Sequence, residues 1–237
     1  MRMVVVVLAL LATMVSARAG DLVEPRMHLA RGGPETPQIA LTLDACSGGV
    51  DMRILDALIA NRVPATLFLT GKWLSANPEA VALIKQHPDL FQFENHGAEH
   101  VPAVIGSEKP YGIAPAGTAE AVMAEVEGGA FFIESLFGRK PAWYRDATAL
   151  YSPAAIDMIE QAGFRIAGFS LNGDAGASFS AEAAAESIAG AQDGDVIIAH
   201  MNQPTRAAGD GVVAGILALK AKGFRFVRLD QVEVVGE

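Results

Sequence analysis

The sequence has 237 residues, 51% of them apolar, and a formal charge of −9 at pH 7. No run of basic residues is longer than Arg139-Lys140, so nucleic acid and anionic membrane surfaces are poor candidate partners. Because Cys46 is the single cysteine, the chain has no internal disulfide, and its stability must come from the burial of apolar residues.

Residues 1–19 are expected to be a secretory signal peptide. Arg2 precedes an apolar run over residues 3–14, and Ala17 and Ala19 supply the small residues of a cleavage site. The run is shorter than the roughly 20 residues that span a bilayer. We therefore expect an exported protein, periplasmic or secreted, without membrane insertion after cleavage. Residues 20–37 would form an N-terminal segment, and residues 38–237 one domain.

From Gln38 onward, short apolar runs alternate with longer amphipathic stretches, which is typical of α/β folds with a parallel sheet or barrel. We expect strands at 39–43, 65–69, 91–94, 142–144, 165–169, 196–199 and 224–227. Helices are expected at 52–61, 78–87, 118–137, 153–162, 181–191 and 211–222. Gly71, Gly163 and Gly223 lie where an element should stop.

Two loops stand out between these elements. The stretch 106–117 is rich in Gly and Pro, which predicts an irregular segment that forms a lid or a groove wall. Residues 202–211 are expected to form a second loop of this kind.

Ionisable residues follow several of the expected strands, at the end where parallel βα folds gather their functional loops. These residues are Asp44, His96, Arg145 with Asp146, Asp174 and His200. One catalytic site accounts for their common position better than a set of unrelated core residues does.

Each candidate also has a purely structural interpretation. His96 and His100 are four residues apart, which places both on one helical face, where they bind one metal ion or are simply solvated. Asp44 either acts in catalysis or caps a turn after its strand. Arg145 orients a carboxylate or pairs with a surface acid, and His200 follows an apolar run that also suits a buried core histidine.

Cys46 lies two residues after Asp44 and before Ser47-Gly48-Gly49. A cysteine next to a candidate base suggests a nucleophile. We interpret it instead as a small buried residue under a turn.

In motif order, residues 38–229 resemble the polysaccharide deacetylases of the NodB-homology type, carbohydrate esterase family 4. The stretch "LTLDAC" (41–46) is similar to the family's Thr-Phe-Asp-Asp motif, and "NHGAEH" (95–100) to its Asn-His-(Ser/Thr)-x-x-His motif. The stretch "WYRDA" (143–147) resembles the arginine motif, and "IIAHM" (197–201) the Leu-x-His motif. The resemblance implies a distorted (β/α)7 barrel.

The same resemblance implies roles for the motif residues. Asp44 would be the catalytic base, oriented by Arg145, and His200 the general acid. His96 and His100 would bind a divalent metal, most simply zinc, with cobalt or another divalent ion as alternatives. Asp174, in the loosely matching stretch "SLNGDAGA" (170–177), would tune His200.

Two positions depart from the family pattern. Its second Asp, a metal ligand, is Ala45 here, and its Ser/Thr after the first histidine is Gly97. Either another carboxylate supplies the missing ligand, or two histidines and waters hold the metal. Asp51 is the first choice for that carboxylate, with Asp44 itself or Glu94 as alternatives.

The sequence therefore predicts a metal-dependent hydrolase that removes N-acetyl or O-acetyl groups from a polysaccharide or glycan. Activated water would be the nucleophile, with Asp44 as base and His200 as acid. Two alternatives remain: a non-catalytic glycan-binding pseudoenzyme on the same fold, favoured by Ala45, and a hydrolase of another small amide or ester.

Overall fold

The computed structural model describes residues 21–236, so the expected signal peptide lies outside the described residues. The main sheet has the order β6-β5-β4-β3-β2-β8-β7, with β9 also paired to β2, and every pair is parallel. The predicted α/β class with a parallel, barrel-like sheet is confirmed. The strands are β2 (Gln38–Ala45), β3 (Ala65–Leu69), β4 (Phe91–Asn95), β5 (Trp143–Tyr144), β6 (Arg165–Ile166), β7 (Leu171–Asn172), β8 (Val196–His200) and β9 (Arg225–Val227).

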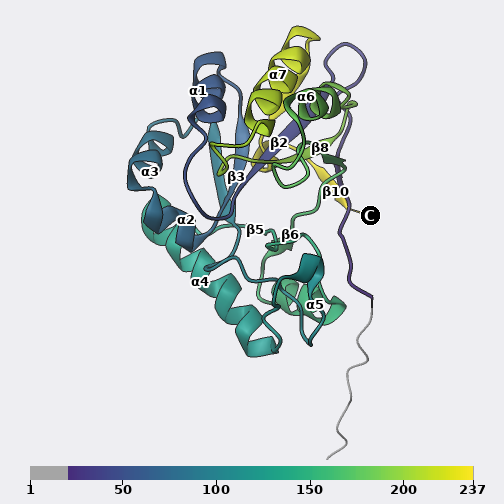
Figure 1. Cartoon of the computed structure of the whole chain (residues 1–237). Coiled ribbons are helices and arrows are strands. Elements are labelled where there is room, and N and C mark those ends of the chain that lie inside the picture. Colours follow the sequence, from purple (N-terminus) through teal and green to yellow (C-terminus); the bar gives the residue numbers. More distant parts are fainter. Residues whose placement is uncertain (1–20, 237) are drawn as a thin grey trace, which may run out of the picture.

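Seven α-helices within residues 21–236 pack around the outside of these strands (Figure 1). They are α1 (Met52–Asn61), α2 (Gly71–Ala76), α3 (Pro78–Lys85), α4 (Ala119–Phe137), α5 (Pro153–Gln161), α6 (Ala181–Ala189) and α7 (Ala208–Ala221). Gly163 and Gly223 follow α5 and α7 with φ of +90° and +85°, as expected for residues that end a helix. Within the described part of the chain, the helices fall short of the length and apolar character that a membrane span requires.

Gly71 lies two residues past the end of β3, as expected for a residue near the end of an element, and it also begins α2. The hydroxyl of Thr70 accepts a hydrogen bond from the backbone N–H of Trp73 and so caps this short helix.

The single strand predicted over 165–169 is wrong, because the chain forms two short strands at opposite ends of the sheet. The N–H of Ala167 still bonds the β5 carbonyl of Tyr144, whereas the N–H of Ser170 bonds Val196 on β8. The chain thus crosses from one sheet edge to the other within a few residues, which curls the sheet into a barrel. Gly168 lies at the crossing, where a Cβ atom would be 2.1 Å from the carbonyl oxygen of Pro25.

Side-chain alternation along β2 determines which residues reach the barrel interior. Leu41 and Leu43 are fully buried in the main apolar core, together with residues of α1 and α7. Burying each leucine stabilises the fold by roughly 1.5–3 kcal/mol. A one-residue slip would lose both contributions and place Asp44 in this apolar layer, so the strand register is strongly fixed.

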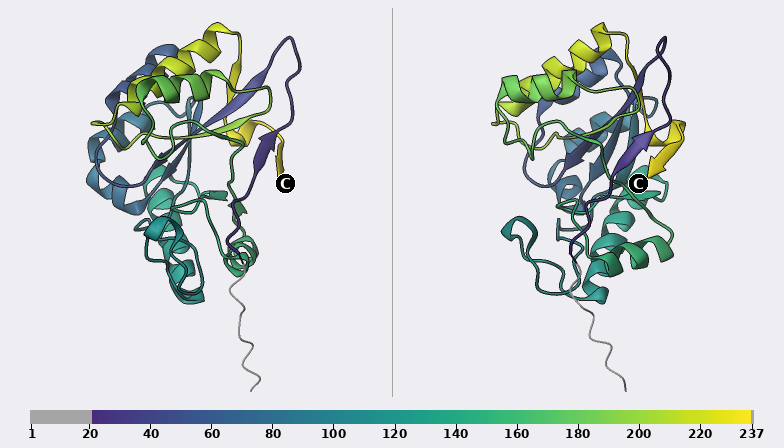
Figure 2. Two further views of the ribbon diagram at one scale, coloured as in Figure 1. Left: turned by 45° about the vertical axis from the view of Figure 1, so that its right-hand side comes forward. Right: turned by 90° about the vertical axis from the view of Figure 1, so that its right-hand side faces the viewer.

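Residues 21–37, the expected N-terminal segment, pack against the barrel. There β1 (Met27–Leu29) pairs antiparallel with β10 (Val234–Gly236), a small sheet that the sequence did not predict. Figure 2 shows the two strands side by side, one purple and one yellow.

Candidate functional site

The strand register places the candidate base and acid next to each other. Asp44 on β2 and His200 on β8 are partners across adjacent parallel strands. Asn95 on β4 likewise pairs with Tyr144 on β5, so His96 and Arg145 follow these two strands at the same edge. The structure therefore brings the sequence-predicted residues together at the carboxyl ends of four strands.

Arg145 is completely buried and holds the Asp44 carboxylate. Its Nη1 donates to Asp44 Oδ1 at 2.8 Å and to the hydroxyl of Thr42 at 2.9 Å, while Nη2 donates to the carbonyl of Gly168 at 2.9 Å. The guanidinium also lies over the ring of Phe68, 4.2 Å from its centroid.

These contacts determine the charge of Asp44. Burial alone would raise its pKa, but the positive charges of Arg145 and His96 outweigh burial and hold the pKa below the ordinary value. The carboxylate is therefore ionised, and its Oδ2, which faces His96 Nε2 at 3.8 Å, is not bound by Arg145.

In its structural interpretation Arg145 would pair with Asp146 or another surface carboxylate, but Arg145 pairs with the buried Asp44 instead. Asp146 accepts hydrogen bonds from the backbone of Ala103 and from the backbone and hydroxyl of Thr148. Burial raises the pKa of Asp146.

His200 is bound to Asp174 in two ways. Its Nδ1 lies 2.9 Å from Asp174 Oδ1, and its backbone N–H donates to Oδ2 at 2.7 Å. Burial opposes the charged imidazole, but the hydrogen bonds and charges of Asp174 and Cys46 raise the pKa of His200 well above its ordinary value. Since an ionised carboxylate only accepts hydrogen bonds, Nδ1 carries the proton that is bound to Asp174. Nε2 is therefore the ring nitrogen that is free to donate or accept a proton.

His96 and His100 share one site, although the helix that we expected to carry them is wrong. They lie in a loop after β4, and φ is +89° at Gly97 and +68° at His100. Their ring centroids are 5.0 Å apart. His96 Nδ1 donates to the carbonyl of Arg145 at 2.9 Å, so in the neutral ring Nε2 carries the lone pair. His100 Nε2 is buried without a hydrogen-bond partner among residues 21–236.

Cys46, to which we had given a packing role, lies against these imidazoles. Its Sγ is 3.5 Å from His96 Nε2, and one donor atom from each of Cys46, His96 and His100 lies within 4.8 Å of the others. Burial would raise the pKa of the thiol, but the three neighbouring histidines, including His200, hold it well below the ordinary value. The sequence signal for this residue was strand alternation, which places positions 44 and 46 on the same face.

Two of the three carboxylates that we had proposed as third ligands, Asp51 and Glu94, bind elsewhere. Asp51 caps α1 and forms a close ion pair with Arg53, whose Nη2 lies 2.6 Å from Oδ2. Glu94 accepts the backbone N–H of Trp143 at 2.7 Å and pairs with Arg139. Neither is part of the donor group around His96, so the expectation for Asp51 is corrected.

The donor group fits a divalent metal. Two imidazole nitrogens and a thiolate are ligands of the zinc type. The buried Nε2 of His100 has no partner in the described residues, and a bound cation would supply one.

A cleft of about 440 Å³ opens over Asp44 and His200. The irregular loop 106–117 contributes Tyr111 and Ile113 to its wall, and the side chain of Tyr111 is 75% exposed. This placement supports the groove-wall role that we predicted for the loop. Further lining residues are Glu24, Asp146, Ala147, Thr148, Ala149, Phe169, Asn172, Ala175, Gly176 and Ile198.

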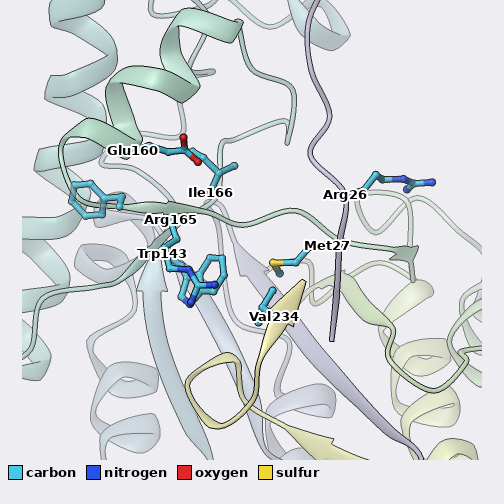
Figure 3. Close-up of a pocket in the computed structure, with 8 residues that line it drawn as sticks. Arg26, Met27, Trp143, Glu160, Arg165, Ile166 and Val234 are labelled. Carbon is cyan, nitrogen blue, oxygen red and sulfur yellow. The ribbon is translucent and has the colours of Figure 1, made fainter. Parts of the chain in front are cut away.

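A second hollow, of about 360 Å³, lies apart from these residues (Figure 3). There the guanidinium of Arg165 lies over the ring of Trp143, 3.8 Å from its centroid. None of the candidate site residues lines this hollow, so we assign it no role in the chemistry.

Residues 31–167, more than half of the chain, match the sequence model of the polysaccharide deacetylase family. No curated protein sequence matches the chain.

Similar folds occur among solved structures. The Bc1960 peptidoglycan N-acetylglucosamine deacetylase is 20% identical, with 88% of this chain and 92% of that chain covered and a TM-score of 0.71. A family 4 acetyl xylan esterase from Clostridium thermocellum, in complex with a cobalt ion, is 23% identical, with coverages of 82% and 89% and a TM-score of 0.65. BA3943 from Bacillus anthracis, a pseudoenzyme of carbohydrate esterase family 4, is 18% identical, with coverages of 85% and 67% and a TM-score of 0.65.

These likenesses confirm the distorted (β/α)7 barrel of the NodB-homology type. The chain belongs to the polysaccharide deacetylase family of hydrolases.

Proposed function

We propose that this protein is a metal-dependent hydrolase that removes N-acetyl or O-acetyl groups from a polysaccharide or glycan. The observation that carries the proposal is the position of Asp44 beside His200 at the cleft, with the His96–His100 pair adjoining Asp44. Membership of the deacetylase family supports a glycan as substrate.

His96 and His100 would hold the metal through their Nε2 atoms. When bound, a divalent ion supplies Lewis-acid activation of water and of an acyl oxygen. The cobalt ion in the acetyl xylan esterase relative supports a divalent metal here, and imidazole ligands favour zinc or cobalt.

Asp44 is suited to the role of base. Because Arg145 engages Oδ1, the other carboxylate oxygen accepts the proton of the attacking water without competition from the guanidinium. Arg145 also fixes the orientation of the carboxylate and keeps it ionised.

His200 is suited to the role of acid. Asp174 holds Nδ1–H and favours the protonated ring, so Nε2 carries a proton for the departing amine or alcohol. An amide needs this proton more than an ester does, since an amine leaves poorly unless it is protonated.

Export is part of the proposal. The signal-like sequence over 1–19 supports a periplasmic or secreted enzyme that meets cell-wall or external glycans. Cell fractionation, with detection of a shortened chain outside the cytoplasm, tests this expectation.

Acetate release tests the proposed activity. Chelator-stripped protein reloaded with zinc or cobalt is incubated with acetylated chitooligosaccharides, peptidoglycan fragments and acetylated xylan. We expect acetate from at least one substrate, only after metal is restored. Asp44→Asn, verified to be folded and to bind metal, should release none. If the metal-loaded native protein releases no acetate from the whole panel, the proposal is rejected.

A second candidate function is a glycan-binding pseudoenzyme, which Ala45 and the pseudoenzyme relative favour. It predicts glycan affinity that neither chelator nor Asp44→Asn changes, without acetate release. A hydrolase of another small acyl compound would instead cleave small esters or amides and no polymer.

A further inference from the structure

We propose that the thiolate of Cys46 is the third protein ligand of the metal, in place of the carboxylate that the family resemblance implies. This inference rests on the proposed function, whose metal site it completes. It assigns the chain a cysteine–histidine–histidine centre.

The separation of the donor atoms matches tetrahedral coordination. With a zinc–sulfur distance of about 2.3 Å and a zinc–nitrogen distance of about 2.05 Å, tetrahedral ligands lie about 3.5 Å apart. Cys46 Sγ lies 3.5 Å from His96 Nε2, and the third donor, from His100, is within 4.8 Å of both. One ion can therefore contact all three with small side-chain adjustments.

Strand geometry explains why residue 46, and not residue 45, faces the metal. Ala45 is completely buried in the apolar layer between the sheet and the helices, where it joins Leu43 and Leu69. An aspartate at position 45 would carry its charge into that layer, unless the end of the strand rearranged. Cys46 returns to the face of Asp44, so the ligand position has moved by one residue along the chain.

The turn that presents Cys46 is held on several sides. The hydroxyl of Thr70 donates to the carbonyl of Cys46 at 2.6 Å, and Trp73 Nε1 donates to the carbonyl of Gly49 at 3.0 Å. Asn202 Nδ2 donates to the carbonyl of Ser47 at 2.5 Å. These bonds fix the backbone on both sides of the thiol, as expected of a preorganised ligand rather than of a mobile surface residue.

A thiolate changes the metal preference of the site. Thiolate and imidazole favour zinc and cobalt, whereas carboxylate ligands also suit magnesium and manganese. The centre should therefore discriminate against magnesium and manganese, and metal should shield Cys46 from alkylation.

Cobalt spectroscopy tests the ligand without any measurement of activity. Metal-free native protein is titrated with Co²⁺ while the visible bands and the near-ultraviolet sulfur-to-cobalt charge-transfer band are recorded. We expect both in the native protein. Cys46→Asp should keep the visible bands and lose the charge-transfer band. Cys46→Ser should also lose the charge-transfer band and bind cobalt more than about 100-fold more weakly. Replacing a residue that only hydrogen-bonds a metal ligand already lowers metal affinity about 10–100-fold, and loss of a ligand should cost more.

Ser47→Ala is the matched control, since it alters the adjacent side chain and should leave both bands in place. Bound zinc should also slow the modification of Cys46 by iodoacetamide. Cobalt binding without a charge-transfer band, at the same affinity in native protein and Cys46→Ser, would overturn the inference while leaving the two-histidine site of the proposed function intact. Absence of cobalt binding to the folded native protein would overturn it as well. Spectra as expected without acetate release would reject only the proposed activity.

Discussion

Glu125, on α4, holds the backbone of His100 in place. Its Oε1 accepts the N–H of His100 at 2.7 Å and that of Val101 at 3.1 Å, and both carboxylate oxygens lie near the N–H of Glu99. His100 has φ of +68°, a conformation that costs a non-glycine residue roughly 1–2 kcal/mol. Each hydrogen bond to a charged group contributes about 1.5–3 kcal/mol, so the set of them outweighs this cost.

Two glycines allow the loop after β4 to pack closely on α4. A Cβ atom at Gly97 would lie 2.2 Å from Glu125 Oε1, and one at Gly129 would lie 2.1 Å from Asn95 Oδ1. The glycine that replaces the family's Ser/Thr therefore has a physical reason: the carboxylate of Glu125 occupies the space.

We predict that Glu125→Ala lowers the affinity for cobalt or zinc by about 10–100-fold, because His100 loses the contacts that hold its backbone. Competition titration against a metal indicator measures the affinity. Glu127→Gln, an exposed change on the same helix, is the control and should have no effect. Native affinity in a folded Glu125→Ala variant would show that the loop holds His100 without Glu125.

Arg145→Lys should raise the pKa of Asp44, since lysine keeps the positive charge but lacks the planar guanidinium whose N–H groups bind Asp44, Thr42 and Gly168. A base must be ionised to act, so the acidic limb of the pH–rate profile should move to higher pH. Arg139→Lys, at a 44% exposed side chain that pairs with Glu94, should leave the limb unchanged. An unshifted limb in Arg145→Lys would contradict the role of Arg145 in setting the charge of Asp44.

Arg145→Met should destabilise the fold by about 3–5 kcal/mol, because it leaves a buried carboxylate without its partner. Urea unfolding measures the loss. The double variant Asp44→Asn/Arg145→Met should recover part of it, since the uncompensated charge is gone. Equal losses in the single and double variants would indicate that the packing of Arg145 against Phe68, rather than its charge, matters.

The parts of the fold that local pattern determines were predictable. The strand at 65–69 and the helix at 52–61 match the structure residue for residue, because their apolar alternation and spacing are clear. The break between β6 and β7 does not follow from local pattern, and at this break the chain packs closely against Pro25, a residue of a distant segment.

The candidate site was likewise predictable from the sequence only in part. Asp44 and His200 converge because parallel strands place their carboxyl ends together, which the order of the motifs already indicated. The spacing of His96 and His100 suggested a helix, which does not form. The loop conformation of His100 depends instead on Glu125, a residue of a different element, and spacing along the chain cannot reveal that contact. Cys46 follows the end of β2, so alternation indicates its position on the face of Asp44 only when the pattern is continued past the strand that we expected at 39–43.

Asp174→Asn should lower the pKa of His200, because it removes the carboxylate that favours the imidazolium. The acid must be protonated to act, so the alkaline limb of the pH–rate profile should move to lower pH.

His200→Ala should reduce amide deacetylation by about 100-fold or more. Hydrolysis of an aryl acetate should fall much less, because that leaving group needs no proton. Equal losses on both substrates would contradict the acid role.

The same pair predicts how stability depends on pH. The folded-state pKa of His200 is raised, so its contribution to the free energy of unfolding is fully present below the unfolded value of about 6.5 and is lost as pH rises through the folded value. The stability difference between native protein and Asp174→Asn should therefore be largest at acidic pH and shrink towards alkaline pH. Urea unfolding across a pH series checks this, and a difference that grows with pH would contradict it.

Tyr111 tests whether the loop 106–117 binds the glycan. Its exposed ring lines the cleft that contains Asp44 and His200, where it can stack on a sugar face. Such a contact is worth about 0.5–1.5 kcal/mol, so Tyr111→Ala should raise KM for an oligosaccharide by about 2- to 12-fold and leave kcat unchanged. The KM for ethyl acetate, which has no ring to stack on Tyr111, should stay the same. Phe131→Ala, at a 68% exposed ring on α4 outside the cleft lining, is the matched control and should behave as the native protein. If Tyr111→Ala changes kcat on both substrates instead, the loop acts on the catalytic groups and not on the bound chain.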